Sequence, residues 1–277
     1  MAQVAGPSAG GRADAPSPYP GAVKLSYAAR TDPGLRRSGN EDAVRVRADL
    51  DFCVVADGMG GHVAGEVAAA LVVKELERFV AATLIPGGGR PWPVDEDPSL
   101  GPEGNRLRAG LHLANRRLAQ AIADDSTLEG MATTAVAFLA HGAQGAVAHV
   151  GDSRAYRRRG GRIERLTHDH SWVEDQVRAG RLTADQARRH HWRHVVTRAL
   201  MGEEELEVEV AKVDLAAGDR LLLCSDGLPV VLSDSRINAL LGADRQPDDI
   251  VTALIEAANA AGGPDNITVV VVDVNDR

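Results

Sequence analysis

The stretch DFCVVADGMGGHVAGEVAA, residues 51–69, joins an apolar run to a helical pattern. The apolar run predicts a buried central strand, and the apolar spacing after the glycines predicts a helix. Asp57 stands at the junction, and Gly58, Gly60 and Gly61 follow it. A carboxylate beside buried surface is costly unless it is paired or bound to a metal ion. The junction is therefore the first candidate for a functional site.

The predicted strands and helices around this junction do not alternate regularly along the chain, as they would in a doubly wound sheet. Apolar patterning predicts strands at 43–49, 51–57, 132–140, 145–152, 153–166, 219–226 and 266–274. Helical spacing and capping signals predict helices at 65–84, 106–122, 171–180, 182–190 and 249–262. Because strands gather with strands and helices with helices, we expect an α+β layered domain of two sheets with helices outside.

Two segments rich in Pro and Gly bound this domain or interrupt it. Residues 1–21 can bury little surface, so we expect a disordered leader before one domain at 22–277. Residues 86–105 lie between two helical patterns and are expected to form a surface loop.

Composition narrows the possible partners. The chain has 277 residues, 44% of them hydrophobic, which is enough for one sizeable core. A net charge of −8 and only 3% aromatic residues argue against nucleic acid as a partner.

Cys53 and Cys224 lie in apolar runs and suit a reducing cytoplasm. No apolar run reaches the roughly 18 residues that span a membrane. We expect a cytoplasmic monomer.

Acidic residues recur at the ends of the predicted strands. Asp57, Asp152 and Asp226 follow apolar runs beside glycines, Asp265 precedes a strand, and Glu41 and Asp42 begin one. Any one of them can be an ordinary turn residue. Together they favour a site for hard cations, Mg²⁺ or Mn²⁺ rather than Zn²⁺. Carboxylates that converge on two ions activate a water molecule and orient a phosphoryl group.

Eight motifs in order resemble one known family. They are RSGNEDAV, VVADGMGGHVAGEVA, MATTAVA, AHVGDSRAY, LTHDHSWV, VVTRALMG, LLLCSDGL and GGPDNITVVVV. Over residues 25–274 the chain resembles the metal-dependent serine/threonine protein phosphatases of the protein phosphatase 2C type, in their bacterial form. The resemblance implies a central β-sandwich of two antiparallel sheets flanked by helix pairs, a four-layer αββα fold.

The resemblance also implies a role for each matching residue. Asp57 would bridge two catalytic ions, Asp226 and Asp265 would complete the first, and the Gly58 carbonyl and Glu41, through water, would serve the second. Asp42 would lie behind these ligands, and Asp152 with Asp226 would hold a third ion. Arg37 would bind the phosphate. The catalytic residues would be Arg37, Asp57 and Asp226, and a metal-bridging hydroxide would attack phosphorus directly.

Other positions leave roles open. Met59 stands where animal members have a catalytic His, so the acid for the leaving group is either a metal-bound water or His62. Thr133 and Thr134 are interpreted as packing residues. Residues 167–198 match the family's flap. This segment is unusually rich in histidine, with His190, His191 and His194 close together. This cluster suits a transition metal, a pH sensor, or a basic surface that docks acidic phosphopeptides.

The function that follows is hydrolysis of phosphoserine and phosphothreonine in phosphoproteins, with serine/threonine kinases and their targets as substrates. Two alternatives are a pseudophosphatase that keeps the fold as a binding module, and a metal-dependent hydrolase of small phosphoesters.

Overall fold

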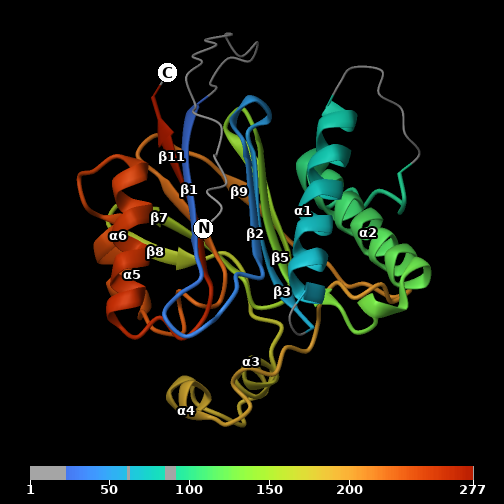
Figure 1. The fold of residues 1–277 in the computed structure, drawn as a ribbon. Coiled ribbons are helices and arrows are strands. Elements are labelled where there is room, and N and C mark those ends of the chain that lie inside the picture. Colours follow the sequence, from blue (N-terminus) through green and yellow to red (C-terminus); the bar gives the residue numbers. More distant parts are fainter. Residues whose placement is uncertain (1–22, 61–62, 85–91, 277) are drawn as a thin grey trace.

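A computed structural model describes residues 23–60, 63–84 and 92–276. Two antiparallel sheets lie face to face, and helices cover both outer faces (Figure 1). The predicted α+β sandwich with flanking helix pairs is therefore confirmed. The predicted leader, residues 1–21, lies outside the described residues.

The first sheet has the strand order β1-β11-β10-β7-β8, and the second has β2-β3-β5-β6-β9, with β4 paired to β3. The strands are β1 Lys24–Asp32, β2 Asp42–Arg47, β3 Phe52–Met59, β4 Ala132–Thr133, β5 Ala135–His141, β6 Gln144–Val150, β7 Arg154–Arg159, β8 Arg162–Arg165, β9 Glu209–Asp214, β10 Arg220–Cys224 and β11 Ile267–Asn275. The helices are α1 Val63–Leu84, α2 Gly101–Asp124, α3 Trp172–Arg178, α4 Ala184–Arg189, α5 Asp234–Leu241 and α6 Pro247–Ala260.

Three hydrophobic layers hold the sandwich together. Along β3, Val54 and Ala56 face the layer under α1 and α2, whereas Cys53 and Val55 face the layer between the sheets. A third layer lies between the first sheet and helices α5 and α6. Because successive side chains of a strand point to opposite faces, a strand buried on both faces reads as a continuous apolar run. This is why β3 and β11 were predictable.

The differences from the predicted elements are local. Helix α2 begins at Gly101, so the predicted loop 86–105 extends too far, and its residues 86–91 lie outside the described residues. Strands β1 and β9 and helix α5 were not predicted. A turn at Gly160 and Gly161 divides the predicted strand 153–166 into β7 and β8, and both glycines have positive φ. Helix α4 begins with a capping box formed by Thr183 and Gln186.

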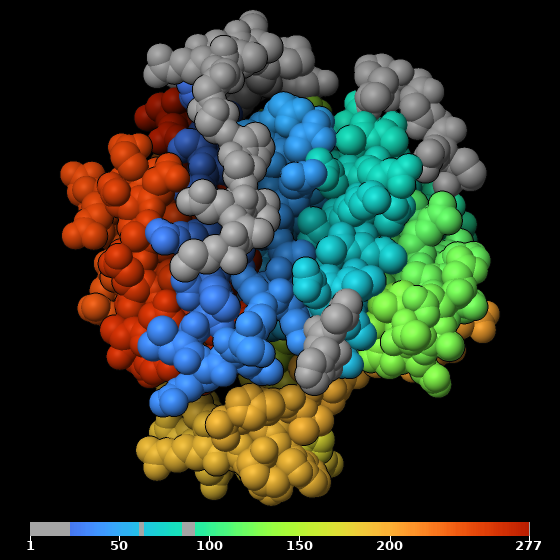
Figure 2. All heavy atoms as spheres, viewed as in Figure 1, coloured from blue at the N-terminus to red at the C-terminus, as the bar shows by residue number. Residues whose placement is uncertain are grey.

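Helices α3 and α4 form a separate lobe at one end of the sandwich (Figures 1 and 2). This lobe falls within residues 167–198, the segment predicted to be the flap, and we refer to it by that name. Its two connections to the body meet in the bridge between Ser171 and Val196. No helix of the described residues has the length and apolar character needed to cross a membrane.

Candidate metal and phosphate site

Asp57 lies near the end of β3, directly opposite Asp42 of β2. Two threonines fix its backbone. The Thr133 hydroxyl donates to the Asp57 carbonyl at 2.8 Å, and the Thr134 N–H donates to the same oxygen at 2.9 Å. The Asp57 N–H donates to the Thr134 hydroxyl at 3.3 Å. The prediction that these threonines only pack was incomplete, since they also set the position of Asp57.

Glu41 is held next to this strand end by backbone contacts. Its N–H donates to the side-chain oxygen of Asn266 at 2.8 Å, and its carbonyl accepts from the Gly58 N–H at 3.2 Å. The Asn266 amide nitrogen donates to the carbonyls of Pro33 and Gly39. Asn266 therefore ties the segment before β2 to the start of β11. Sequence reasoning missed this residue, although it directly follows Asp265.

Asp42 is anchored by one oxygen only. Its Oδ2 accepts hydrogen bonds from the Ser225 hydroxyl at 2.8 Å and from the Thr268 hydroxyl at 2.6 Å. Its Oδ1 is buried and has no hydrogen-bond partner among the described residues. A buried, unpartnered carboxylate oxygen is costly unless a cation or an ordered water satisfies it.

Electrostatics show that the predicted carboxylates converge. Burial raises the pKa of Asp57 well above its usual range, and the charges of Asp226, Asp42, Asp152 and Asp265 raise it further. Burial, with smaller contributions from neighbouring carboxylates, raises the pKa of Asp152 to about 8, that of Asp42 to about 7 and that of Asp226 to about 6. Like charges held this close need a counter-cation to ionise together.

Arg37 and Asp265 meet although 228 residues separate them in the chain. The Arg37 Nη2 donates to Asp265 Oδ2 at 2.8 Å, and the Arg37 side chain remains 56% exposed. This hydrogen bond raises the pKa of Arg37 above its ordinary value. The guanidinium therefore stands at the carboxylate cluster with much of its surface open to solvent.

Gly58 is required by a close approach of backbone segments. A Cβ atom at this position would lie 2.1 Å from the Gly65 carbonyl oxygen and 2.7 Å from the Glu41 carbonyl oxygen. A Cβ atom at Gly65 would in turn lie 2.1 Å from Oε2 of Glu41. The two glycines let the start of α1 pack against β3 and Glu41.

The donor set fits hard divalent cations. Every predicted ligand is an oxygen, and Mg²⁺ and Mn²⁺ prefer carboxylate, carbonyl and water ligands. Among the described residues, the group of three or more candidate ligands within 4.8 Å of one another is His149, His170 and Glu209, not the aspartates.

The flap carries an aromatic cluster. The His190 ring stacks on Trp172 at 4.8 Å and on His191 at 4.4 Å, and Trp192 lies edge-on to Trp172 at 4.6 Å. The stacking contacts account for the packing of these rings without a metal ion. His194 lies where the charges of Asp265 and Arg37 affect its pKa, which burial lowers. His62 lies outside the described residues.

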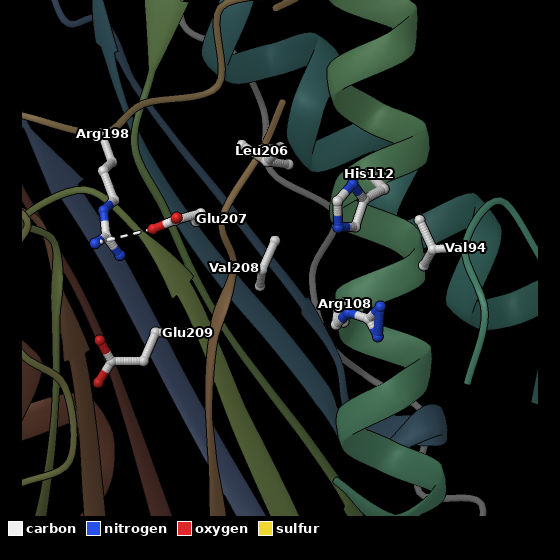
Figure 3. A pocket seen from close by; sticks show the side chains of 8 residues that line it. All are labelled: Val94, Arg108, His112, Arg198, Leu206, Glu207, Val208 and Glu209. Atoms are coloured by element: carbon white, nitrogen blue, oxygen red, sulfur yellow. Dashed lines mark ion pairs between the residues drawn. The ribbon is translucent and has the colours of Figure 1, made fainter. Parts of the chain in front are cut away.

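A groove of about 520 Å³ lies away from the aspartates, between α2 and the segment that leads into β9 (Figure 3). Arg108 and His112 of α2 face Leu206 and Val208 across it, and Glu209 is also among the lining residues. The groove offers no cluster of carboxylates for a metal ion.

Comparison with known proteins agrees with this geometry. Residues 36–267 match the family model described as protein phosphatase 2C. The serine/threonine protein phosphatase PstP of Mycobacterium tuberculosis is 41% identical over 254 residues, which are 91% of this chain and 45% of PstP. The chain thus spans about half the length of that relative. Protein phosphatase PhpP of Streptococcus pneumoniae is 33% identical over 89% of this chain and 96% of its own length.

A solved structure extends the comparison to three dimensions. The catalytic domain of PstP in complex with two manganese ions superposes with a TM-score of 0.78 at 39% identity, over 92% of this chain and 99% of that chain. The motifs, the αββα sandwich and these similarities agree. The chain therefore belongs to the protein phosphatase 2C family.

Proposed function

We propose that this chain is a metal-dependent protein phosphatase that hydrolyses phosphoserine and phosphothreonine. The observation that carries the proposal is the meeting of predicted site residues from distant segments: Asp42 lies opposite Asp57, and Arg37 bonds to Asp265. Ser225, which precedes Asp226, also donates to Asp42. The names of the relatives, serine/threonine phosphatases, and the two manganese ions of the PstP structure support it.

The residues that would hold the ions are Glu41, Asp57, the Gly58 carbonyl, Asp226 and Asp265, with Asp152 and Asp226 for a third ion. When bound, Mn²⁺ or Mg²⁺ lowers the pKa of a coordinated water and offsets the negative charge of the phosphoryl group. Asp42, fixed by Ser225 and Thr268, orients the cluster from behind.

Arg37 would orient the substrate. With Nη2 on Asp265, its guanidinium is held in place and still open to a phosphate oxygen. Guanidinium groups bind phosphate in forked geometry, which fixes orientation as well as charge. Met59 has no proton to donate, so the described side chains assign no acid for the leaving group.

The substrates would be phosphoproteins, including serine/threonine kinases and their targets. Cys53 and Cys224 are both buried and unpaired, which supports the proposal of a reducing cytoplasm as the compartment.

The test is hydrolysis of phosphoserine, phosphothreonine and phosphotyrosine peptides, and of para-nitrophenyl phosphate, with Mn²⁺ or with EDTA. We expect Mn²⁺-dependent turnover of the first two peptides, none with EDTA, and none in a folded Asp57→Asn variant. Activity without metal would refute the mechanism. Mn²⁺ binding without turnover would favour a pseudophosphatase, and turnover of small phosphoesters alone would favour the other hydrolase class.

A further inference from the structure

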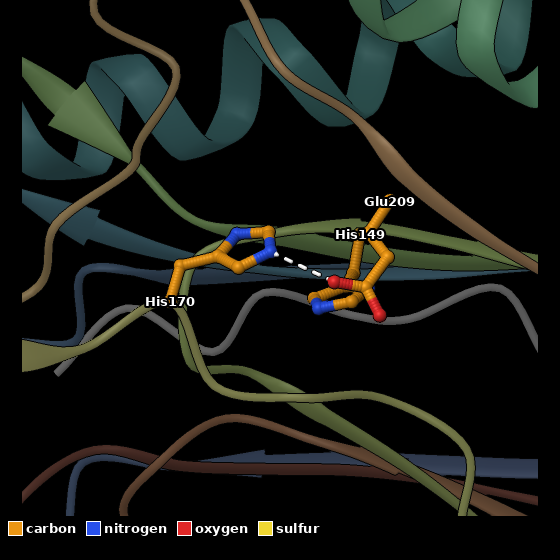
Figure 4. A group of neighbouring side chains, drawn as sticks. All are labelled: His149, His170 and Glu209. Carbon is orange, nitrogen blue, oxygen red and sulfur yellow. Dashed lines mark hydrogen bonds and ion pairs between the residues drawn. The ribbon is translucent and has the colours of Figure 1, made fainter. Parts of the chain in front are cut away.

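His149, His170 and Glu209 form a second polar cluster, at the point where the flap joins the body (Figure 4). Both His side chains are buried, at 2% and 3% exposure. Glu209 begins β9 and lies opposite His149 of β6. Two imidazoles and one carboxylate are residue types that bind Zn²⁺. The hydrogen bonds of the cluster decide whether it is a metal site or a support.

These hydrogen bonds oppose metal binding. The Gly151 N–H donates to His170 Nδ1 at 3.0 Å, so in the neutral ring the proton is on Nε2, which faces Glu209 Oε2 at 3.3 Å. His149 Nε2 donates to the His168 carbonyl at 2.8 Å. The two rings also stack, with centroids 4.6 Å apart and planes 18° apart. An ion lies in the plane of a ring that binds it, so stacked rings do not share one.

The cluster instead holds Gly151, the residue before Asp152. The ring Nδ1 of His170 accepts from the Gly151 N–H, and the backbone N–H of His170 donates to the Gly151 carbonyl at 3.0 Å. On the other side Gly151 packs on Thr134, where a Cβ atom would come within 2.5 Å of the Thr134 side chain. Gly151 has a φ of +105°, which a side chain would strain. The loop that presents Asp152 is therefore clamped from both sides.

The same histidine secures the flap. Its carbonyl accepts the Thr197 N–H at 2.8 Å, so the outgoing and returning chains of the flap meet at this residue. On the far side, Glu209 bonds both His170 and, at 3.0 Å, Nδ1 of His168. Burial and the neighbouring His149 lower the pKa of His170 to about 4, which keeps the ring neutral and Nδ1 free to accept.

We propose that His170, oriented by Glu209, is a positioning residue that places Asp152 at the metal centre by holding Gly151. The inference rests on the proposed function, in which Asp152 is a ligand of the weaker ion. It gives the flap base a role in metal binding that neither the motifs nor the relatives' names assign.

Three substitutions separate the two contacts of the ring. In His170→Asn the amide oxygen stands near the place of Nδ1 and can still accept from Gly151. In His170→Gln the longer amide stands near the place of Nε2 and reaches Glu209 instead. His170→Leu keeps neither contact. Mn²⁺ affinity is measured by isothermal titration calorimetry and by electron paramagnetic resonance of free Mn²⁺, with unfolding in EDTA as the check on stability.

We expect His170→Leu and His170→Gln to weaken the weakest Mn²⁺ site by about 10–100-fold, the usual effect of losing a group that orients a ligand. His170→Asn should recover most of that affinity. The Mn²⁺ concentration for half-maximal turnover should shift in parallel, while kcat at saturating Mn²⁺ changes less.

His149→Leu is the matched control, because His149 is equally buried in the cluster and bonds to His168 rather than to Gly151. It should lower stability and leave the Mn²⁺ titration unchanged. Equal weakening in the His149 and His170 variants, or wild-type Mn²⁺ binding in His170→Gln, would overturn the proposal. If His170→Leu does not fold, the Asn and Gln pair still decides. A wild-type protein that binds Mn²⁺ without hydrolysing phosphopeptides would refute the proposed function, and the titrations would still test His170.

Discussion

Asp226→Asn should stabilise the metal-free protein, although it removes a residue proposed to be essential. Asp226 lies two residues after the end of β10, where the charge of Asp265 repels it and a side-chain hydrogen bond with Asp57 offsets part of that repulsion. Its pKa is raised from 3.8 to about 6, first by burial and then by the charge of Asp265. Asn has nearly the shape of the protonated acid and carries no charge, so the substitution removes the repulsion and leaves the packing.

The magnitude follows from the two pKa values. The folded state holds the Asp226 proton more tightly than the unfolded state does. The destabilisation of the folded state by ionised Asp226 is therefore absent below pH 4 and grows as pH rises toward 6. Above pH 7 it reaches its full size, roughly 2 pKa units or about 3 kcal/mol. For a domain of this size, about 3 kcal/mol corresponds to a rise of about 6–12 °C in the unfolding temperature.

Scanning calorimetry in EDTA at pH 8 and pH 4 measures this directly. We expect Asp226→Asn to melt higher than wild type at pH 8 and to differ by less than about 1 kcal/mol at pH 4. With Mn²⁺ at about 1,000 times its Kd the order should reverse, since the bound ion then stabilises wild type by about 4.1 kcal/mol.

Asp219→Asn provides the contrast, because Asp219 is buried against the Arg159 guanidinium at 2.6 and 2.7 Å. Removing that charge should destabilise the protein at pH 8 by about 2 kcal/mol. If Asp226→Asn also lowers the unfolding temperature in EDTA at pH 8, Asp226 has a favourable structural partner and the electrostatic reasoning is wrong.

Three further outcomes follow from the same geometry. Arg37→Ala should raise KM for a phosphopeptide by about 10-fold, or about 1.4 kcal/mol, with a smaller change in kcat, whereas Arg36→Ala should change neither; an unchanged KM would remove Arg37 from phosphate binding. In a urea titration, Gly58→Ala should lower the free energy of unfolding by about 3 kcal/mol, because its Cβ would lie 2.1 Å from a carbonyl oxygen. Gly39→Ala, with open space around the added Cβ, should leave that free energy unchanged. Mn²⁺ affinity should fall as pH drops from 8 to 6, because carboxyls such as Asp152, with a pKa of about 8, must release protons; calorimetry in two buffers would detect that release, and a pH-independent affinity would contradict it.

The local signals in the sequence were strong where one strand or turn carries the information. The apolar runs of β3 and β11 predicted buried strands, and Asp57 and Asp226 were found because each interrupts such a run beside a glycine. The ordered motifs then predicted the family, which the comparisons confirmed. The role of each site residue stays a proposal that the experiments above test.

Strands β1 and β9 escaped prediction because their apolar content is modest and they form by pairing with distant partners. Strand β1 pairs along its whole length with β11, at the other end of the chain. An edge strand such as β9 draws its stability from one neighbour and from the face it covers, which local propensity does not report.

The supports of the site were decided by tertiary structure. The sequence alone predicted which carboxylates could bind metal, since their chemistry and their places at strand ends are local properties. Only the folded chain brings Arg37 to Asp265, Ser225 and Thr268 to Asp42, and His170 to Gly151. Each of these contacts joins segments far apart in sequence, and its energy depends on burial and on the geometry of the partner, which no local pattern encodes.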